Sequence, residues 1–443
     1  MKQLITNVYV ITMDKQSRVY KDGYLLIEDD LILAIGSMDD QLPNAENIID
    51  GKGGILLPGM INTHTHTGMI PFRSLGDDVP DRLRRFLFPL EKKITKEFVY
   101  HSARYAIAEM LLSGITCFSD MYYFEEEVAK ATDELHARGF LGETIINQPV
   151  CDYNNPFDAL CGAEKFIKKW SNHPRVTPMI APHAPNTNDE ISLLETKRLA
   201  DKYNVPIMMH VAEMTYEMEY FQEHYETTPV RYLEKLGLFN TRFILAHGIF
   251  LDEKDQQILS NNRSRVGISH CIGANTKSAK GVAPIKQLIS KGLSIGLGTD
   301  GPSSGNTLDM FTQMKMVGNF HKTKEADRSL FPAKEIVRMA TIGGAEVLGI
   351  EDRVGTLEVG KQADIVLIET KSINMFPIYD PYAVLVYSAN ASNVESVWID
   401  GYQVVEDKNL VDESLERLRE KLSEQMVEFV AEAKKIADYS TND

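Results

Sequence analysis

Long apolar runs are missing from this sequence of 443 residues. No stretch of about 18 apolar residues occurs, so we expect no membrane-spanning helix. The first residues also lack the apolar core of a secretory signal. Cysteine is scarce, and its four copies show no C-x-x-C spacing, which predicts a reduced cytoplasmic chain without a disulfide framework. Basic residues are outnumbered by acidic residues, 47 to 63, and the resulting net charge of -16 argues against a nucleic-acid partner.

What the middle of the chain does have is a regular alternation of short apolar segments with amphipathic, helix-like segments. This alternation predicts an α/β fold, a (β/α)8 TIM-like barrel. An open doubly wound sheet would alternate in the same way, but no G-x-G-x-x-G follows the first strand. The predicted strands span residues 55–61, 114–120, 140–146, 176–181, 205–210, 243–247, 265–270 and 293–300.

Both ends of the chain carry a different, strand-rich pattern. Neither end could bury a stable core by itself, so we expect the two ends to build one small β-sandwich together. The predicted organisation is residues 1–57 in the sandwich, 58–354 in the barrel, and 355–443 in the sandwich with a terminal amphipathic helix over 410–437. The strands expected at the two ends cover residues 4–13, 23–28, 31–35, 355–361, 363–368, 394–399 and 402–405.

His64 and His66 are two residues apart at the end of the first predicted barrel strand. Side chains at i and i+2 of a strand point the same way, so both rings could hold one ion, although such a pair could also be a hydrogen-bonded strand end. Six of the eleven histidines fall at predicted strand ends, where barrel enzymes build their active sites. This placement predicts a metal site. The polar residues at these ends are His64, His66, Asp120, His183, His210, His247, His270 and Asp300.

Glu213 follows three residues after His210. A carboxylate beside a metal ion can accept a proton from water and pass it on. The alternative is a helix N-terminal charge that the helix dipole favours. We interpret Glu213 as the proton acceptor.

Several segments, taken in chain order, resemble the amidohydrolase superfamily. The similarity extends over essentially the whole chain, and the branch it resembles contains methylthioadenosine/S-adenosylhomocysteine deaminases together with triazine and guanine hydrolases. The segments are His64-Thr65-His66 after a Pro-Gly strand, His210-Val211-Ala212-Glu213, Ala246-His247-Gly248, Ser269-His270-Cys271, and the run from Gly298 to Phe311 that includes Gly-Thr-Asp300-Gly-Pro-Ser-Ser-Gly.

The resemblance implies one divalent ion, zinc or, as the alternative, iron. A two-metal relative would need a bridging lysine at the fourth strand, and residues 176–185 contain no lysine. In the implied mechanism, water attacks the ring carbon, Glu213 shuttles a proton to a ring nitrogen, His247 polarises the water and Asp300 helps to deprotonate it. The implied metal ligands are His64, His66, His210 and Asp300, and the substrate contacts are Glu91, His183 and, near the third strand, Gln148.

Two departures from the family pattern stand out. The seventh-strand segment usually reads Ser-His-Asn-Pro-x-Ser-Asn, whereas here Cys271, Ile272 and Ala274 replace three of its residues. The adenosylhomocysteine-type enzymes also carry arginines after the third strand for the amino-acid carboxylate, and Glu143 and Ala159 align there. A smaller or less anionic substrate is therefore favoured.

These observations predict a metal-dependent deaminase of an aminated N-heterocycle, an adenine nucleoside such as methylthioadenosine, adenosylhomocysteine or adenosine. The alternatives are a guanine- or pterin-type deaminase, a triazine-type chlorohydrolase, and a catalytically silent scaffold. Retention of Glu213 favours an amine leaving group, because ammonia needs a proton donor and chloride does not. We also expect a homo-oligomer, a dimer or a tetramer.

Overall fold

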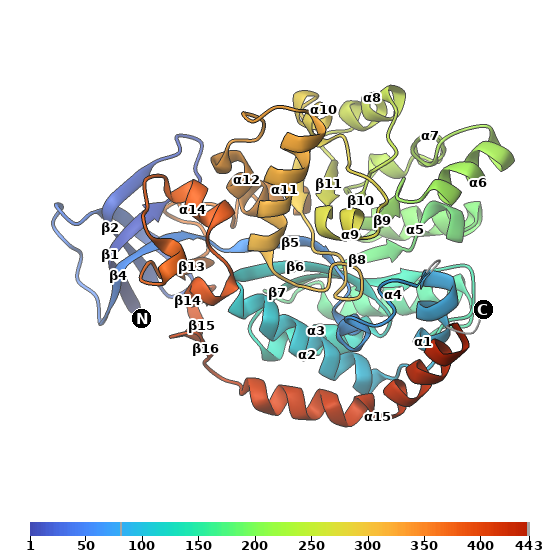
Figure 1. The fold of residues 1–443 in the computed structure, drawn as a ribbon, viewed down its shortest axis with the longest axis horizontal. Helices are drawn as coiled ribbons and strands as arrows, with labels where there is room; N and C mark the ends of the chain where they lie inside the picture. The colour runs from blue at the N-terminus through green and yellow to red at the C-terminus, as the bar shows by residue number, and fades with distance from the viewer. Residues whose placement is uncertain (80–81, 441–443) are drawn as a thin grey trace.

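A computed structural model describes residues 1–79 and 82–440 and shows a barrel with a smaller sheet beside it (Figure 1). The eight barrel strands are parallel, in the order β12-β11-β10-β9-β8-β7-β6-β5, and β12 lies against β5, so the barrel is nearly closed. The predicted (β/α)8 architecture is confirmed. The strands are β5 (Met60–Thr65), β6 (Ile115–Tyr122), β7 (Arg138–Ile145), β8 (Val176–Pro182), β9 (Ile207–Val211), β10 (Phe243–His247), β11 (Val266–His270) and β12 (Ser294–Leu297).

Helices cover the outside of the barrel, and their first residues explain where several of them begin. Thr95, Asn155 and Asp189 each accept a hydrogen bond from a backbone N–H of the first helical turn. The longer helices are α2 (Lys96–Leu112), α3 (Glu125–Glu134), α4 (Pro156–Trp170), α5 (Glu190–Tyr203), α6 (Thr215–Tyr225), α7 (Pro229–Lys235), α8 (Glu253–Asn261), α11 (Met310–Lys324), α12 (Ala333–Ala340), α13 (Ile342–Leu348), α14 (Pro381–Tyr387) and α15 (Leu415–Ser440). Shorter helical segments are η1 (Thr67–Phe72), η2 (Leu83–Leu87), α1 (Phe88–Glu91), η3 (Pro185–Thr187), η4 (Leu238–Asn240), α9 (Ile272–Lys277), α10 (Ile285–Ser290), η5 (Ile373–Met375) and η6 (Ala391–Asn393).

The two chain ends share one mixed eight-stranded sheet, in the order β16-β15-β14-β13-β4-β1-β2-β3. Strand β4 joins the two ends, because it pairs in parallel with β1 and antiparallel with β13. The expectation that both ends build one β-structure is confirmed. The strands are β1 (Lys2–Ile11), β2 (Val19–Glu28), β3 (Leu31–Ser37), β4 (Asn47–Pro58), β13 (Ile365–Ile368), β14 (Val394–Ile399), β15 (Tyr402–Glu406) and β16 (Asn409–Leu410).

Three predicted strands differ from the structure. The apolar segment 55–61 is divided at Gly59 between β4 and β5, where a Cβ atom would lie 2.1 Å from the Thr116 hydroxyl. Residues 355–361 form no strand, because Gly355 and Gly360 take positive φ angles of 90° and 89° that turn the chain. The predicted strand 293–300 is also shorter, and Asp300 lies in the loop after β12.

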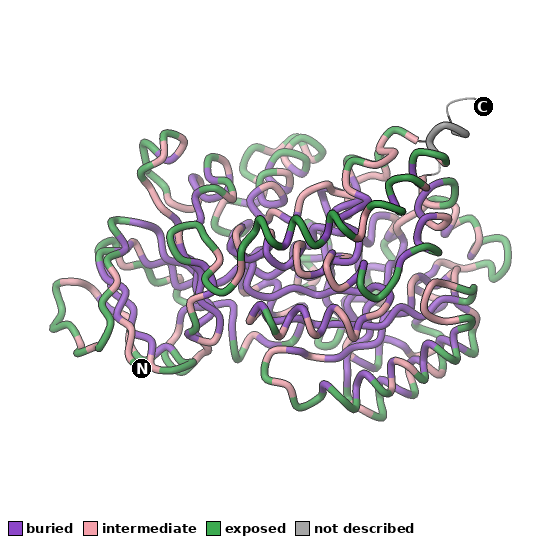
Figure 2. The backbone as a smooth tube through the Cα atoms, turned by 90° about the horizontal axis from the view of Figure 1, so that it is seen from below, coloured by how far each residue is buried: buried purple, intermediate pink, exposed green. Residues whose placement is uncertain are grey.

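Buried residues fill the interior, and exposed residues lie on the outer faces of the helices (Figure 2). Inside the barrel, side chains such as Met179, Met208 and Ile244 pack against Val347 and Leu348 of α13. This apolar plug occupies the end where the strands begin, so polar side chains can gather where they end. Among the described residues, no helix has the length and apolarity needed to cross a membrane.

Candidate metal centre and active site

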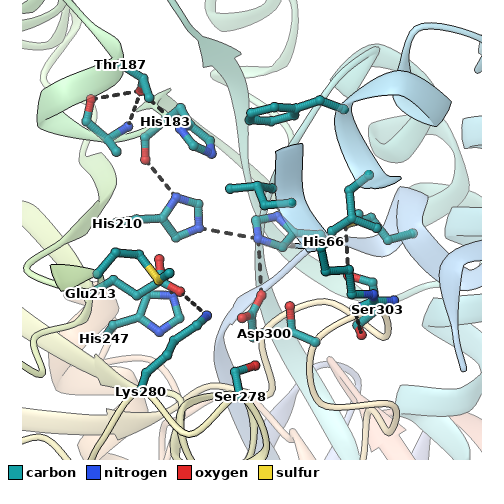
Figure 3. Close-up of a pocket in the computed structure, with 18 of the residues that line it drawn as sticks. His66, His183, Thr187, His210, Glu213, His247, Ser278, Lys280, Asp300 and Ser303 are labelled. Atoms are coloured by element: carbon teal, nitrogen blue, oxygen red, sulfur yellow. Dashed lines mark hydrogen bonds and ion pairs between the residues drawn. The ribbon is translucent and has the colours of Figure 1, made fainter. Parts of the chain in front are cut away.

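Three imidazole nitrogens converge where the barrel strands end. His210 Nε2 lies 3.2 Å from His64 Nε2 and 3.4 Å from His66 Nε2. These separations match the edge of a tetrahedron around an ion with bonds of about 2.0–2.1 Å, which is ~3.3 Å. Asp300 Oδ1 completes the group at 3.3 Å from His66 Nε2 and 3.9 Å from His64 Nε2 (Figure 3).

The opposite ring nitrogens are held by groups outside the cluster. Nδ1 of His66 lies 2.6 Å from the Met121 carbonyl oxygen, and Nδ1 of His210 lies 2.7 Å from the His183 carbonyl oxygen. A carbonyl can only accept, so both Nδ1 atoms carry a proton, and Nε2 is in each ring the nitrogen that can bind an ion. This tautomer is the one that metal-binding histidines adopt.

The electrostatics of the cluster also suit a cation. Burial lowers the pKa values of His64 and His210 well below the ordinary value, so both rings are neutral ligands at neutral pH. Burial also lowers the pKa of His66, but the hydrogen bond and the negative charge of Asp300, with smaller effects of Asp120 and the Met121 carbonyl, together outweigh burial and raise the value to about 9. An incoming cation would therefore displace one proton from His66.

The residues fit one ion better than two. Among the described residues, two groups could hold a metal: His64, His66 and His210, or His64, His247 and Cys271. Both groups use His64, so they provide for a single centre. Cys271, one of the departures from the family pattern, is buried, and burial raises the pKa of its thiol well above the ordinary value.

Glu213 and His247 face each other beside the centre. Glu213 Oε2 lies 3.7 Å from His247 Nε2. His247 Nδ1 lies 2.8 Å from Asn275 Oδ1. Because an amide oxygen only accepts, Nδ1 carries the proton and donates to Asn275, and the other nitrogen, Nε2, is directed at Glu213. Burial alone would raise the pKa of Glu213, but His247 and Lys280 lower it to about 2, so the carboxylate is ionised and can accept a proton.

Two further residues hold Glu213 in place. Glu217, at the start of α6, accepts hydrogen bonds from the backbone N–H groups of Ala212 and Glu213 at 2.8 and 2.9 Å. Lys280 donates to Glu213 Oε1 at 2.5 Å (Figure 3). Glu213 therefore sits on a loop that is fixed through both its backbone and its side chain.

A cavity of about 490 Å³ opens from this centre, a size suited to a small-molecule ligand. Glu91 and His183 line it, as predicted for substrate contacts. Tyr122 Oη donates to Glu91 Oε1 at 3.0 Å, and burial raises the pKa of Glu91 to about 7. Burial lowers the pKa of His183 to about 4, so this ring is neutral at pH 7. Its Nδ1 lies 3.0 Å from the Thr187 hydroxyl oxygen.

Other strand-end residues lie away from the cavity. Gln148 is exposed in the loop after β7 and is absent from the cavity lining, because the chain turns outward where Asn147 N–H donates to the Thr187 carbonyl. Asp120 accepts hydrogen bonds from the backbone and hydroxyl of Thr67. His270 Nε2 lies 3.0 Å from His321 Nε2, behind the barrel wall.

Sequence reasoning did not identify Asn275, Glu217 or Lys280. Asn275 and Lys280 lie just beyond the seventh strand, in the same segment as Cys271, Ile272 and Ala274, which depart from the family pattern. Glu217 carries a usable signal, because a carboxylate in the first turn of a helix can accept from free backbone N–H groups.

Comparison with known proteins agrees with this geometry. The model of the amidohydrolase family matches residues 55–404, and the chain therefore belongs to this family. It is 35% identical over 429 residues to the 5-methylthioadenosine/S-adenosylhomocysteine deaminase of Thermodesulfovibrio yellowstonii, covering 93% of this chain and 97% of the relative. The corresponding deaminase of Syntrophobacter fumaroxidans is 36% identical over 424 residues, with 94% and 96% covered.

Solved structures support the same fold. An adenosine deaminase from Xanthomonas campestris with bound zinc has a TM-score of 0.91 at 29% identity, covering 100% of this chain and 99% of that one. An atrazine chlorohydrolase from Arthrobacter aurescens, at 24% identity, has a TM-score of 0.88 with 96% and 100% covered, and supports the fold alone.

Proposed function

We propose that this protein is a metal-dependent deaminase that releases ammonia from a 5′-substituted adenine nucleoside such as methylthioadenosine. The observation that carries the proposal is the convergence of three imidazole nitrogens with the Glu213–His247 pair at one end of a ligand-sized cavity. The full-length similarity to methylthioadenosine/S-adenosylhomocysteine deaminases supports the same activity.

His64, His66, His210 and Asp300 would hold one divalent ion, and zinc is the proposed metal because nitrogen-rich sites suit it and a 29%-identical relative binds it. When bound, such an ion makes a water molecule acidic enough to act as a nucleophile at neutral pH. Asp300 Oδ1 lies close enough to the ring nitrogens to orient that water as well as to bind the cation.

The remaining steps are proton transfers by the chain's own residues. The ionised Glu213 takes a proton from the attacking water and delivers it to the neighbouring ring nitrogen of the purine. His247 Nε2, held by Asn275, faces the same region and steadies the developing hydroxyl. The proton of the new hydroxyl then passes by way of Asp300 to the exocyclic amine, the C–N bond breaks, the amine leaves as ammonia, and the ring keeps the oxygen as a carbonyl. Glu91 would hold the ribose hydroxyls, and His183 would contact the base.

The charges in the cavity favour a substrate with an uncharged tail. Arg82 donates to three backbone carbonyls and lies 3.6 Å from Asp77 Oδ1. Lys277 donates to Asp77 at 2.8 Å, and Lys280 donates to Glu213. Each lysine and arginine among the described lining residues is thus already committed to an acceptor. The carboxylate of adenosylhomocysteine would have to share one of these cations with the acceptor that it already holds, so methylthioadenosine is the better fit.

An ammonia-release assay on purified protein tests the proposal directly. The panel is adenosine, methylthioadenosine, adenosylhomocysteine, guanine and a pterin, with chloride release from a chlorotriazine as the arm for the alternative chemistry. We expect the highest kcat/KM with methylthioadenosine, and about one ion per chain by elemental analysis. Turnover confined to guanine, pterin or chlorotriazine would overturn the proposal, and chromatography with light scattering would test the predicted homo-oligomer.

A further inference from the structure

Lys280 stands out because its charged end is placed inside the active-site cavity. Its side chain is 17% exposed, and so is that of Glu213, to which it donates at 2.5 Å. Lysine is rarely buried without a specific partner, because desolvating an ammonium costs more than a surface ion pair returns. Here the ammonium is directed at the group that we propose to move the proton (Figure 3).

The remaining contacts of Glu213 show what Lys280 contributes. Glu217 holds only the backbone N–H of Glu213, and His247 Nε2 is 3.7 Å from Oε2, which is too far for a hydrogen bond. Among the described residues, Lys280 alone donates a hydrogen bond to the Glu213 carboxylate. Without it, this side chain could rotate about its last torsion, which is broad for a glutamate.

Lys280 also determines which carboxylate oxygen of Glu213 faces the centre. With Oε1 held by the ammonium, Oε2 is the oxygen that faces His247 and the centre. Lys280 comes from the loop after α9, while Glu213 comes from the loop after β9, so the pair also joins two loops that line the cavity. Fixing a reacting group within a fraction of an ångström is a recognised source of rate.

We propose that Lys280 is a positioning residue for the acid–base carboxylate: it holds Glu213 Oε1 so that Oε2 is presented to the attacking water. This inference rests on the proposed deaminase function. It assigns Lys280 no direct contact with the reacting atoms, and it predicts an effect on kcat rather than on substrate affinity or metal binding.

The experiment compares Lys280→Met, Lys280→Arg and Lys280→Ala with the wild type, using methylthioadenosine as substrate. Lys280→Met should lower kcat by roughly 10- to 100-fold, the weight of one hydrogen bond to a charged group, with KM and metal content unchanged. Lys280→Arg should recover part of the loss. Ethylammonium ions should raise kcat of Lys280→Ala, whereas sodium at the same ionic strength should not, since only an amine can replace the missing donor. Lys197→Met is the matched control, because Lys197 is also paired with a carboxylate, Asp201, but on the outer helix α5.

The outcomes separate the two claims. No ammonia release by the wild type on any nucleoside would overturn the proposed function and this role with it. An active wild type with normal kcat in Lys280→Met would overturn only the role of Lys280. A loss that neither arginine nor ethylammonium restores would show a merely structural residue and would also overturn it. If Lys280→Met does not fold, the arginine variant and amine rescue of Lys280→Ala decide the matter in the same way.

Discussion

The carboxylate of Glu213 accepts a hydrogen bond from the Lys280 ammonium with one oxygen and faces the His247 imidazole with the other, so a substitution here tests one defined group. Glu213→Gln keeps shape and polarity but cannot accept a proton. We expect kcat to fall by about 10²–10⁴, the usual weight of general acid–base catalysis. Metal content should be unchanged, since Glu213 is not among the residues that we propose to hold the ion. Steady-state kinetics with elemental analysis check this, and near-normal turnover at full metal occupancy would contradict it.

His247 offers a test of whether two residues act on the same water. His247→Asn should also lower kcat, because the amide cannot replace an imidazole directed by Asn275. The double variant with Glu213→Gln should lose less than the product of the two single losses, since groups that act in one step are not additive.

Glu91 should make substrate capture depend on pH. Its ordinary pKa lies near 4.5, burial raises it to about 7, and the opposing effects of Tyr122 and His66 do not cancel that rise. The free enzyme therefore carries a neutral Glu91 below about pH 7 and a charged one above it. Ribose hydroxyls donate more strongly to the charged form, so kcat/KM should increase as the pH rises through about 7. The pH profile of Glu91→Gln should lack this step, and an identical step in both proteins would assign it elsewhere.

The sequence predicts some of these residues and not others for a physical reason. His64, His66 and His210 lie on or directly beyond strands whose periodicity is readable, and strand ends in a barrel meet at one face. Asn275 and Lys280 act through partners on other loops, and loop geometry leaves no periodic signal, whereas Glu217 holds the loop directly before its own helix. Gln148 shows the converse: it is near the right strand end in sequence, but its loop turns outward.

At the scale of elements, helix α15 connects the chain's C-terminal region to the segments around the site. Phe429 of α15 packs its ring 4.7 Å from that of Phe72 in η1 and 5.1 Å from that of Phe98 in α2. Phe429 is buried, and η1 follows directly after His66. The terminal helix predicted from its apolar periodicity is therefore confirmed, and it packs on the body of the same chain.

Phe429→Ala should lower the free energy of unfolding by about 3–5 kcal/mol, since it removes a buried ring and leaves a cavity. Chemical denaturation measures this loss. Val427→Ala is the control on the same helix: Val427 is 70% exposed, so its change should remain within about 0.5 kcal/mol. Equal effects of the two substitutions would show that α15 does not pack as described.

Other element boundaries could not be read from the sequence. The run 55–61 is one apolar segment by composition, yet it serves two sheets, because Gly59 allows the chain to pass close to Thr116. Residues 355–361 look like a strand by their alternation, but two glycines with positive φ convert them into turns. In both cases tertiary contact decides what local pattern leaves open.

At the scale of the whole molecule, the C-terminal region is tied to the barrel through a buried guanidinium. Arg138, at the start of β7, donates to both carboxylate oxygens of Asp364 at 3.0 and 3.1 Å and to Asp400 at 2.5 Å. The Arg138 side chain is 2% exposed, so no water can replace these partners. Strand β13 also pairs with β4 along its whole length. We infer that the barrel and the shared sheet depend on each other for folding.

Deleting residues 355–443 should therefore leave a chain that does not remain folded and monomeric. The deletion would expose the apolar face around β4, including Leu56 and Leu57, and would leave one edge of β4 unpaired. It would also leave the charge of Arg138 without its carboxylate partners. Asp364→Asn tests the contribution of the Arg138–Asp364 pair alone. Removing one partner of a buried pair should lower the free energy of unfolding by about 3–5 kcal/mol. Glu195→Gln, in an exposed pair with Arg198, should cost no more than about 1 kcal/mol. Size-exclusion chromatography and thermal melts measure both; a truncated chain as soluble and heat-stable as the full one would show that the barrel folds without the region that closes its sheet.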